Sequence, residues 1–82
     1  MILYFEFENR KVTADVSWPE KNEPIIVNLS DPRMIKEFPT DLYFEVGLRN
    51  NVEFIVEDRN NPRLIDLQKS ISRRLQEFVN KY

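Results

Sequence analysis

Hydrophobic and polar residues alternate in two neighbouring segments near the start of the chain. The apolar positions are Leu3, Phe5, Phe7, Val12, Ala14, Val16 and Trp18, and polar residues separate most of them. A period of two residues is typical of a half-buried β-strand. A two-residue turn at Asn9-Arg10 places Phe7 opposite Val12, so that the apolar residues of both strands share one face. The pattern therefore predicts a β-hairpin over residues 2–18.

A loop, a short strand and a short helix are predicted to follow. Residues 17–24 contain two prolines among charged and amide residues, which indicates a loop, and the mostly apolar residues 25–29 predict a strand. Asp31 then precedes Pro32, and an aspartate followed by a proline is a common start of a helix. We expect this helix to extend from Pro32 to Phe38, because Pro39 ends it.

Two further strands are predicted from the alternation in residues 42–48 and 52–57. A two-residue turn would set Leu48 opposite Glu53, whereas the apolar faces match when Leu48 lies opposite Val52. We therefore predict a three-residue connection over residues 49–51, with one asparagine in the left-handed conformation. Gly47 falls on the polar face, where a bulge or a close backbone approach would explain a glycine.

The C-terminal segment has the pattern of an amphipathic helix. Asn61-Pro62 repeats the helix start of Asp31-Pro32, and a helix from Pro62 to Lys81 would be about 30 Å long. Its apolar stripe consists of Leu64, Leu67, Ile71, Leu75, Phe78, Val79 and Tyr82. The order of elements predicts a single α+β domain over residues 1–82. Its mainly antiparallel sheet has four or five strands and is covered on one face by the long C-terminal helix, with a short helix after the third strand.

The composition rules out several kinds of chemistry. The 82 residues include no cysteine and no histidine, so disulfides, thiolate nucleophiles and histidine-dependent catalysis are excluded. The single glycine, Gly47, excludes the glycine-rich loops that bind phosphates. Together with the small size, these absences predict that the protein is not an enzyme and takes no cofactor.

The apolar runs also bear on location. None approaches the roughly 20 residues that span a bilayer. Glu6 interrupts the apolar start of the chain too early for a signal peptide. We therefore expect a soluble, cytoplasmic protein without membrane contact.

The predicted outer face of the sheet is acidic. Residues 1–60 hold 7 basic and 12 acidic side chains, a net charge of −5, while residues 61–82 hold 5 and 2, a net charge of +3. The outward acids are Glu6, Glu8, Asp15, Glu45, Glu53 and Glu57. We interpret this face as a docking surface for another, basic protein, although an antiparallel sheet also presents polar residues to water when it binds nothing. The residues expected to bind the partner are Tyr4, Glu6, Tyr43, Glu45, Glu53, Ile55 and Glu57.

Other interpretations stay open beside this one. Arg63, Arg74 and Lys81 fall along one flank of the predicted helix, so the alternative function is nucleic-acid binding, which a pI near 5.1 disfavours. The acids lack the spacing of a cation site, so no metal is expected. A homodimer that shares the apolar stripe and a monomer are equally compatible with the pattern. Trp18 is expected to cover one end of the core, with a role as a partner anchor as the alternative.

Overall fold

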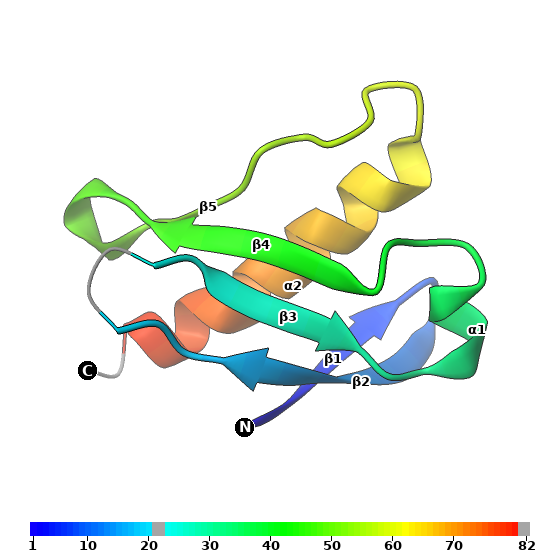
Figure 1. Cartoon of the computed structure of the whole chain (residues 1–82), viewed down its shortest axis with the longest axis horizontal. Helices are drawn as coiled ribbons and strands as arrows, with labels where there is room; N and C mark the ends of the chain where they lie inside the picture. Colours follow the sequence, from blue (N-terminus) through cyan, green and yellow to red (C-terminus); the bar gives the residue numbers. More distant parts are fainter. Residues whose placement is uncertain (21–22, 81–82) are drawn as a thin grey trace.

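Five antiparallel strands follow one another in chain order and form a single sheet. The computed structural model describes residues 1–20 and 23–80. The elements are β1 (Ile2–Phe7), β2 (Arg10–Ser17), β3 (Ile25–Leu29), α1 (Pro32–Ile35), β4 (Asp41–Val46), the 3-10 helix η1 (Leu48–Asn50), β5 (Val52–Glu53) and α2 (Pro62–Val79). Each strand pairs antiparallel with the next, as Figure 1 shows. The predicted α+β fold class is therefore confirmed.

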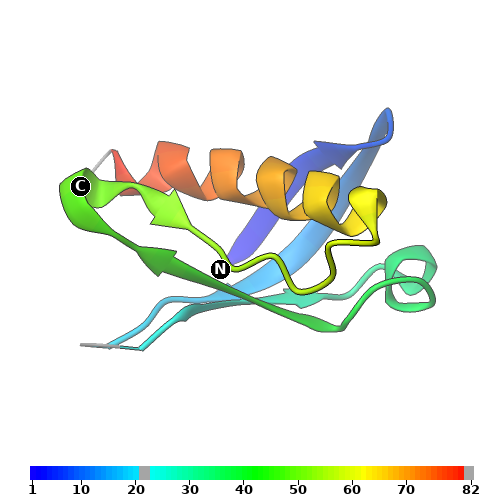
Figure 2. The ribbon, with the colours of Figure 1, turned by 90° about the horizontal axis from the view of Figure 1, so that it is seen from above.

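Helix α2 lies across one face of the sheet and leaves the other face uncovered (Figure 2). It contacts both outer strands, β1 and β5, so the sheet curls around it. The buried core consists of Leu3, Phe5, Phe7, Val12, Ala14, Val16, Ile25, Val27, Leu29, Met34, Phe38, Leu42, Phe44, Leu64, Leu67, Ile71 and Leu75. Burial of these side chains between the helix and the sheet is the main force that holds the two layers together. The stripe predicted for the C-terminal helix is thus largely covered by the protein's own sheet.

The β1–β2 hairpin has the predicted faces, but the predicted register is wrong by two residues. Phe7 lies opposite Arg10, and Phe5 lies opposite Val12. The turn is formed by Glu8 and Asn9, with φ values of 50° and 63°. Two positive φ angles are the geometry of the two-residue turns whose twist matches that of paired strands. The observed register differs from the predicted one by two residues, and a shift of two residues keeps every side chain on the same face. The apolar side chains are therefore buried in both registers.

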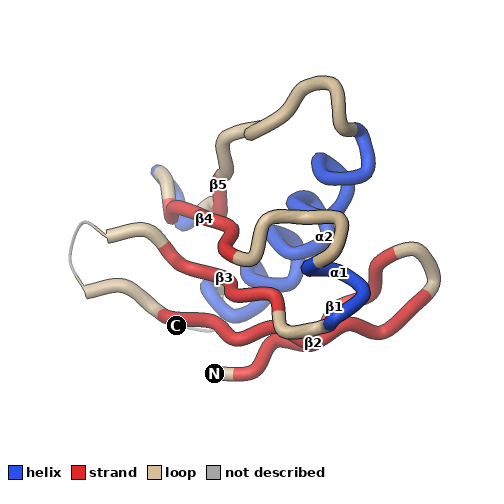
Figure 3. The backbone as a smooth tube through the Cα atoms, turned by 45° about the vertical axis from the view of Figure 1, so that its right-hand side comes forward, coloured by secondary structure: helices blue, strands red, loops and turns tan. Residues whose placement is uncertain are grey.

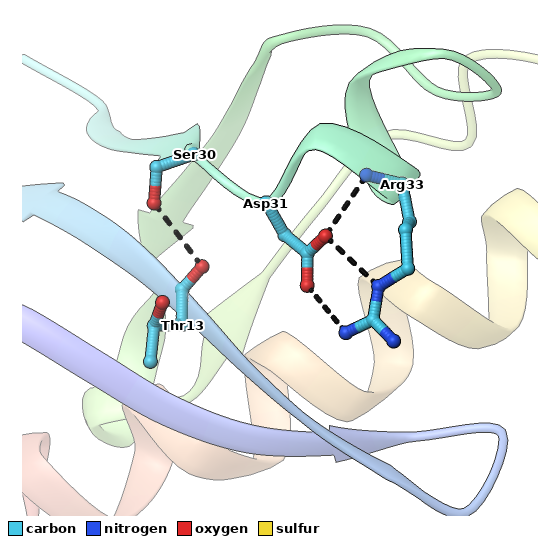
Figure 4. Close-up of polar contacts among 4 residues, drawn as sticks. All are labelled: Thr13, Ser30, Asp31 and Arg33. Carbon is cyan, nitrogen blue, oxygen red and sulfur yellow. Dashed lines mark hydrogen bonds and ion pairs between the residues drawn. The ribbon is translucent and has the colours of Figure 1, made fainter.

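Both helices begin with the predicted capping chemistry. The Asp31 carboxylate accepts a hydrogen bond from the Arg33 backbone N–H at 2.9 Å, and the same carboxylate binds the Arg33 guanidinium (Figure 4). The Asn61 side chain accepts from the Leu64 backbone N–H at 3.1 Å. Pro32 and Pro62 follow these caps, where a missing N–H costs nothing.

The ends of the helices and of the long loop differ in part from the predictions. α1 ends at Ile35, three residues before the predicted end, although Phe38 N–H still bonds to Met34 carbonyl and its ring is buried. α2 ends at Val79. Lys81 and Tyr82, the last residues of the predicted helix and of its stripe, lie outside the described residues, as do residues 21–22 of the predicted loop. Ser17 belongs to β2 and not to that loop.

The β4–β5 register also differs from the prediction. Val46 lies opposite Val52, and the connection spans residues 47–51 instead of 49–51. Arg49 and Asn50 both adopt left-handed φ angles, of 64° and 59°, so one asparagine does take the predicted conformation. Because the chain turns two residues early, Leu48 is 89% exposed and Val46 is also exposed, where both were expected in the core.

Strand β5 is shorter than predicted. It ends at Glu53 instead of continuing to residue 57, and the chain then leaves the sheet as a loop that leads to α2 (Figure 3). Phe54 still packs its ring edge-on against Phe44, with centroids 6.0 Å apart, but Val56 is partly exposed. The core therefore receives two apolar residues from this segment, Val52 and Phe54, where the alternation predicted three.

Candidate functional site

The uncovered face of the sheet is rich in carboxylates, as the sequence indicated. Lys11 is the basic residue that the strands place on this face. The acidic side chains of the face, all of them exposed, are Glu6, Asp15, Asp41, Glu45, Glu53 and Glu57. Asp41 replaces Glu8 in the predicted set. Glu8 lies in the β1–β2 turn, where Arg63 binds its carboxylate at 2.6 Å and holds the pKa of Glu8 below its ordinary value. Glu8 is therefore not part of a free acidic surface.

Five of the seven residues predicted to bind a partner lie around one hollow of about 410 Å³. We call this the acidic hollow, and its lining residues are Pro24, Tyr43, Glu45, Glu53, Phe54, Ile55 and Glu57. It lies where the chain after β5 diverges from β4, on the face of the sheet that α2 leaves uncovered. Tyr4 and Glu6, the other two predicted residues, lie on β1 at the far edge of the sheet. There they line a different hollow of about 370 Å³, together with Phe5, Lys11 and Arg74.

The acidic hollow combines unpaired negative charge with exposed apolar surface. No ion pair joins Glu45, Glu53 or Glu57 to any of residues 1–20 or 23–80. Between these carboxylates, the side chain of Ile55 is 83% exposed and that of Tyr43 is 49% exposed. Large apolar side chains in water are the residues that anchor interfaces when a partner covers them. The combination suits a partner that brings both positive charge and apolar contact.

Gly47 has a direct connection with the acidic hollow. A Cβ atom at position 47 would lie 2.6 Å from the Glu53 carboxyl carbon, which is far closer than such atoms approach. The close approach expected at this glycine is therefore made by a side chain and not by backbone. The glycine leaves the room that the Glu53 carboxylate occupies over the β4–β5 connection.

Two glutamines of α2 hold the segment that forms one wall of the acidic hollow. Gln76 accepts a hydrogen bond from Val52 N–H at 2.8 Å, and its amide nitrogen donates to the Asn50 carbonyl at 2.6 Å. Gln68 donates to the Ile55 carbonyl at 3.0 Å. Gln68 is buried, and its Oε1 has no hydrogen-bond partner within the described residues. Gln76 thus binds the chain at the start of β5, and Gln68 binds it after Glu53, where strand pairing with β4 has ended.

Sequence reasoning missed this pair of glutamines, although one signal was present. Position 68 lies on the same face of α2 as Leu64, Ile71 and Leu75, because it follows Leu64 by four residues and precedes Ile71 by three. A polar residue within an apolar stripe requires a hydrogen-bond partner when it is buried. The sequence marks Gln68 as unusual, but it does not identify the carbonyl that Gln68 binds.

The basic flank of α2 is used within the protein. Arg63 binds the carboxylates of Glu8 and Glu37, at 2.6 and 2.9 Å, and its guanidinium lies over the Phe38 ring. Arg74 donates to the Tyr4 carbonyl at 2.8 Å and forms an ion pair with Glu77. Lys81, the third residue of the predicted flank, lies outside the described residues. Two of the three cations thus have intramolecular partners, which weakens the nucleic-acid interpretation.

Trp18 lies beside the C-terminal end of α2. It is 40% exposed and lines a hollow of about 390 Å³ with Asn50, Phe78 and Val79. Trp18 thus covers the end of the helix only in part.

The part of the chain that the structure describes contains no group of three or more acidic side chains placed to hold a metal ion. Among the same residues, no helix is long and apolar enough to cross a membrane. The chain matches no model of a known protein family, no curated protein and no solved structure.

Proposed function

We propose that this protein is a small, non-enzymatic module that binds another protein, of basic character, through the acidic hollow. The observation that carries the proposal is the set of three carboxylates, Glu45, Glu53 and Glu57, which have no cationic partner within the described residues. Exposed Ile55 and Tyr43 lie between them. Lysine or arginine side chains of a partner would neutralise the acids while its apolar groups cover these two residues. A protein that binds a partner in this way would act as an adaptor, a regulator or an inhibitor.

The charge of the uncovered face also bears on the choice of partner. Two copies that met face to face through this surface would bring like charges together, which costs several kcal/mol when such groups are juxtaposed. A basic partner has the opposite effect, because the acidic face accelerates its approach. The proposal therefore favours a different protein over a second copy at this site.

Carboxylate chemistry supports the non-enzymatic part of the proposal. Among the described residues, arginine hydrogen bonds lower the pKa of Glu8 and the pKa of Asp31. A lowered pKa suits an ion pair, whereas a general acid near neutral pH needs a raised one. The expected cytoplasmic location belongs to the same proposal.

Capture of partners from an extract of the native source tests the proposed function. The tagged wild-type protein, the Glu45→Lys/Glu53→Lys variant and the Glu6→Lys variant are compared, each with and without nuclease. The matched control is Glu6→Lys, because Glu6 is an exposed acid of the same face that lies outside the acidic hollow. We expect the wild type and the Glu6→Lys control to capture a partner protein in the presence and in the absence of nuclease, and we expect the double variant to lose it. Equal retention by all three proteins contradicts the assignment of the site, and a nuclease-sensitive ligand contradicts the proposed partner class.

A further inference from the structure

Strand β4 leaves part of its outer edge without a strand partner. Backbone groups in an antiparallel strand point alternately to the neighbour on one side and to the other side. Leu29 N–H bonds to the Thr40 carbonyl at 2.7 Å, so the even-numbered residues of β4 direct their backbone groups toward β3. The odd-numbered residues point the opposite way, where Glu45 meets Glu53. Tyr43 and Asp41 point the same way, beyond the end of β5.

The segment after β5 turns away instead of completing this pairing. In the register of Glu45 with Glu53, Tyr43 would lie opposite Ile55, but strand pairing ends at Glu53. The Ile55 carbonyl bonds to the Gln68 side chain. No hydrogen bond within residues 1–20 and 23–80 joins the backbone of Tyr43 to the segment 54–57. Figures 1 and 3 show this segment diverging from β4 on its way to α2.

At the other edge of the sheet, a side chain binds the backbone of the edge strand. On β1, the carbonyl of Tyr4 accepts a hydrogen bond from Arg74 of α2. A strand added to β1 would need the same carbonyl, so the Arg74 side chain hinders strand addition at Tyr4. The structure shows no such side chain bound to the backbone of Tyr43 or Asp41 in the described chain. The open edge of β4 is therefore the more accessible of the two.

The acidic hollow lies at this open edge, and its lining specifies what can enter. Tyr43 and Glu45 come from β4 and Glu53 from β5, while Phe54, Ile55 and Glu57 come from the diverging segment 54–57. From these features we infer that an extended segment of a basic partner adds to the β4 edge as a strand. Its backbone pairs with Tyr43, and its lysine or arginine side chains meet the three carboxylates. The inference rests on the proposed function and specifies how the partner binds.

A pair of synthetic peptides tests this inference. The first is an acetylated peptide of about eight residues in which lysine alternates with valine, long enough at about 3.3 Å per residue to pass the open edge. The second has the same sequence with methyl groups on alternate backbone nitrogens, which keeps the charge but removes the donors needed for strand pairing. Binding to the full chain is measured by calorimetry, and the exchange of the Tyr43 amide hydrogen with solvent is followed by NMR.

We expect the unmodified peptide to bind at least about tenfold more tightly than the methylated one, because two lost backbone hydrogen bonds weaken binding by that order. We also expect the unmodified peptide to slow exchange of the Tyr43 amide by at least about tenfold. Equal affinities with an unchanged Tyr43 amide would overturn strand addition and leave charge-driven docking at the acidic hollow intact. No binding of the unmodified peptide at millimolar concentration would also overturn strand addition, whereas the capture experiment separately decides the proposed function.

Discussion

Glu45 and Glu53 lie directly opposite each other on β4 and β5, as a cross-strand pair of like charges. Such pairs destabilise a sheet, and a cross-strand partner of opposite charge would stabilise it. Gly47 eases the arrangement, because the Glu53 carboxylate occupies the space that any larger residue would fill there. The pair is therefore expected to lower the stability of the free protein, and a positively charged group of a partner would relieve the repulsion.

Neutralising one member of this pair is expected to stabilise the free protein. In Glu53→Gln the repulsion with Glu45 is removed, and the free energy of unfolding should rise by a few tenths of a kcal/mol at low ionic strength. The gain should shrink in high salt, because salt screens exposed charges. The gain in stability is measured by urea unfolding at two salt concentrations, with the wild type, Glu53→Gln and the control Glu20→Gln compared. A loss of stability in Glu53→Gln alone would contradict this account of the pair.

The two glutamines of α2 are expected to differ in their contributions to stability. Gln76 makes three hydrogen bonds, to Val52 N–H, the Asn50 carbonyl and the Asn80 side chain, whereas Gln68 makes one and leaves its Oε1 unbonded. At about 1 kcal/mol for each net bond, Gln76→Leu should cost about 2–3 kcal/mol and Gln68→Leu about 1 kcal/mol or less. Urea unfolding compares the two variants directly.

Amide exchange shows where each glutamine acts. Gln76→Leu should increase exchange of the Val52 amide, which donates to Gln76, while the amides of β1 and β2 stay protected. A larger loss of stability in Gln68→Leu than in Gln76→Leu would show that the hydrogen bond to Ile55 holds the segment and that the bonds near Val52 do not.

The ion pair between Arg63 and Glu8 makes a pH-dependent contribution to stability. The hydrogen bond from Arg63 lowers the pKa of Glu8 below its ordinary value of 4.5. A group with a lowered pKa in the folded protein stabilises it above the unfolded-state pKa, and this contribution is lost as the pH falls through the folded-state value. Arg63→Met should therefore be less stable than the wild type above about pH 4.5. The difference should become smaller at more acidic pH.

Thermal unfolding at a series of pH values tests this dependence. The control is Arg59→Met, because Arg59 has no ion pair within the described residues. The difference between Arg59→Met and the wild type should stay nearly constant across the same range. A gap for Arg63→Met that widens on acidification would contradict the assigned role of Glu8.

Leu42 and Leu48 were both predicted to lie in the core, but truncation is expected to affect them very differently. Leu42 is fully buried on β4, whereas Leu48 is 89% exposed in η1. Leu42→Ala should lower the free energy of unfolding by about 2–5 kcal/mol, and Leu48→Ala should change it by less than about 0.5 kcal/mol. Urea unfolding of both variants checks the register of β4 with β5. Similar losses for both would favour the alternation-based register, in which Leu48 lies in the core.

The layers of the fold were predictable because local patterns determine them. The period of two residues in β1 and β2 and the stripe of α2 each specify a buried face without knowledge of the rest of the chain. The caps at Asp31 and Asn61 are equally local, since each side chain binds an N–H two or three residues away.

The registers and the length of β5 were not predictable in the same way. A shift of two residues keeps every side chain on its face, so alternation could not choose between the turns at Glu8-Asn9 and Asn9-Arg10. β5 ends at Glu53, and the carbonyl of Ile55, two residues further on, bonds to Gln68, thirteen residues later in the sequence and on another element. Such contacts depend on the tertiary arrangement, which is why Tyr4 and Glu6 were grouped with residues from the opposite edge.

Mapping of the bound surface by NMR tests the central claim most directly. The captured partner is added to the isotopically labelled full chain, and the backbone amide signals of the two edges of the sheet are compared. The account predicts large shifts for Tyr43, Glu45, Glu53, Ile55 and Glu57, with little change for Tyr4 and Glu6. Shifts centred on Tyr4 and Glu6, or along Arg63 and Arg74 of α2, would contradict the acidic hollow as the binding site.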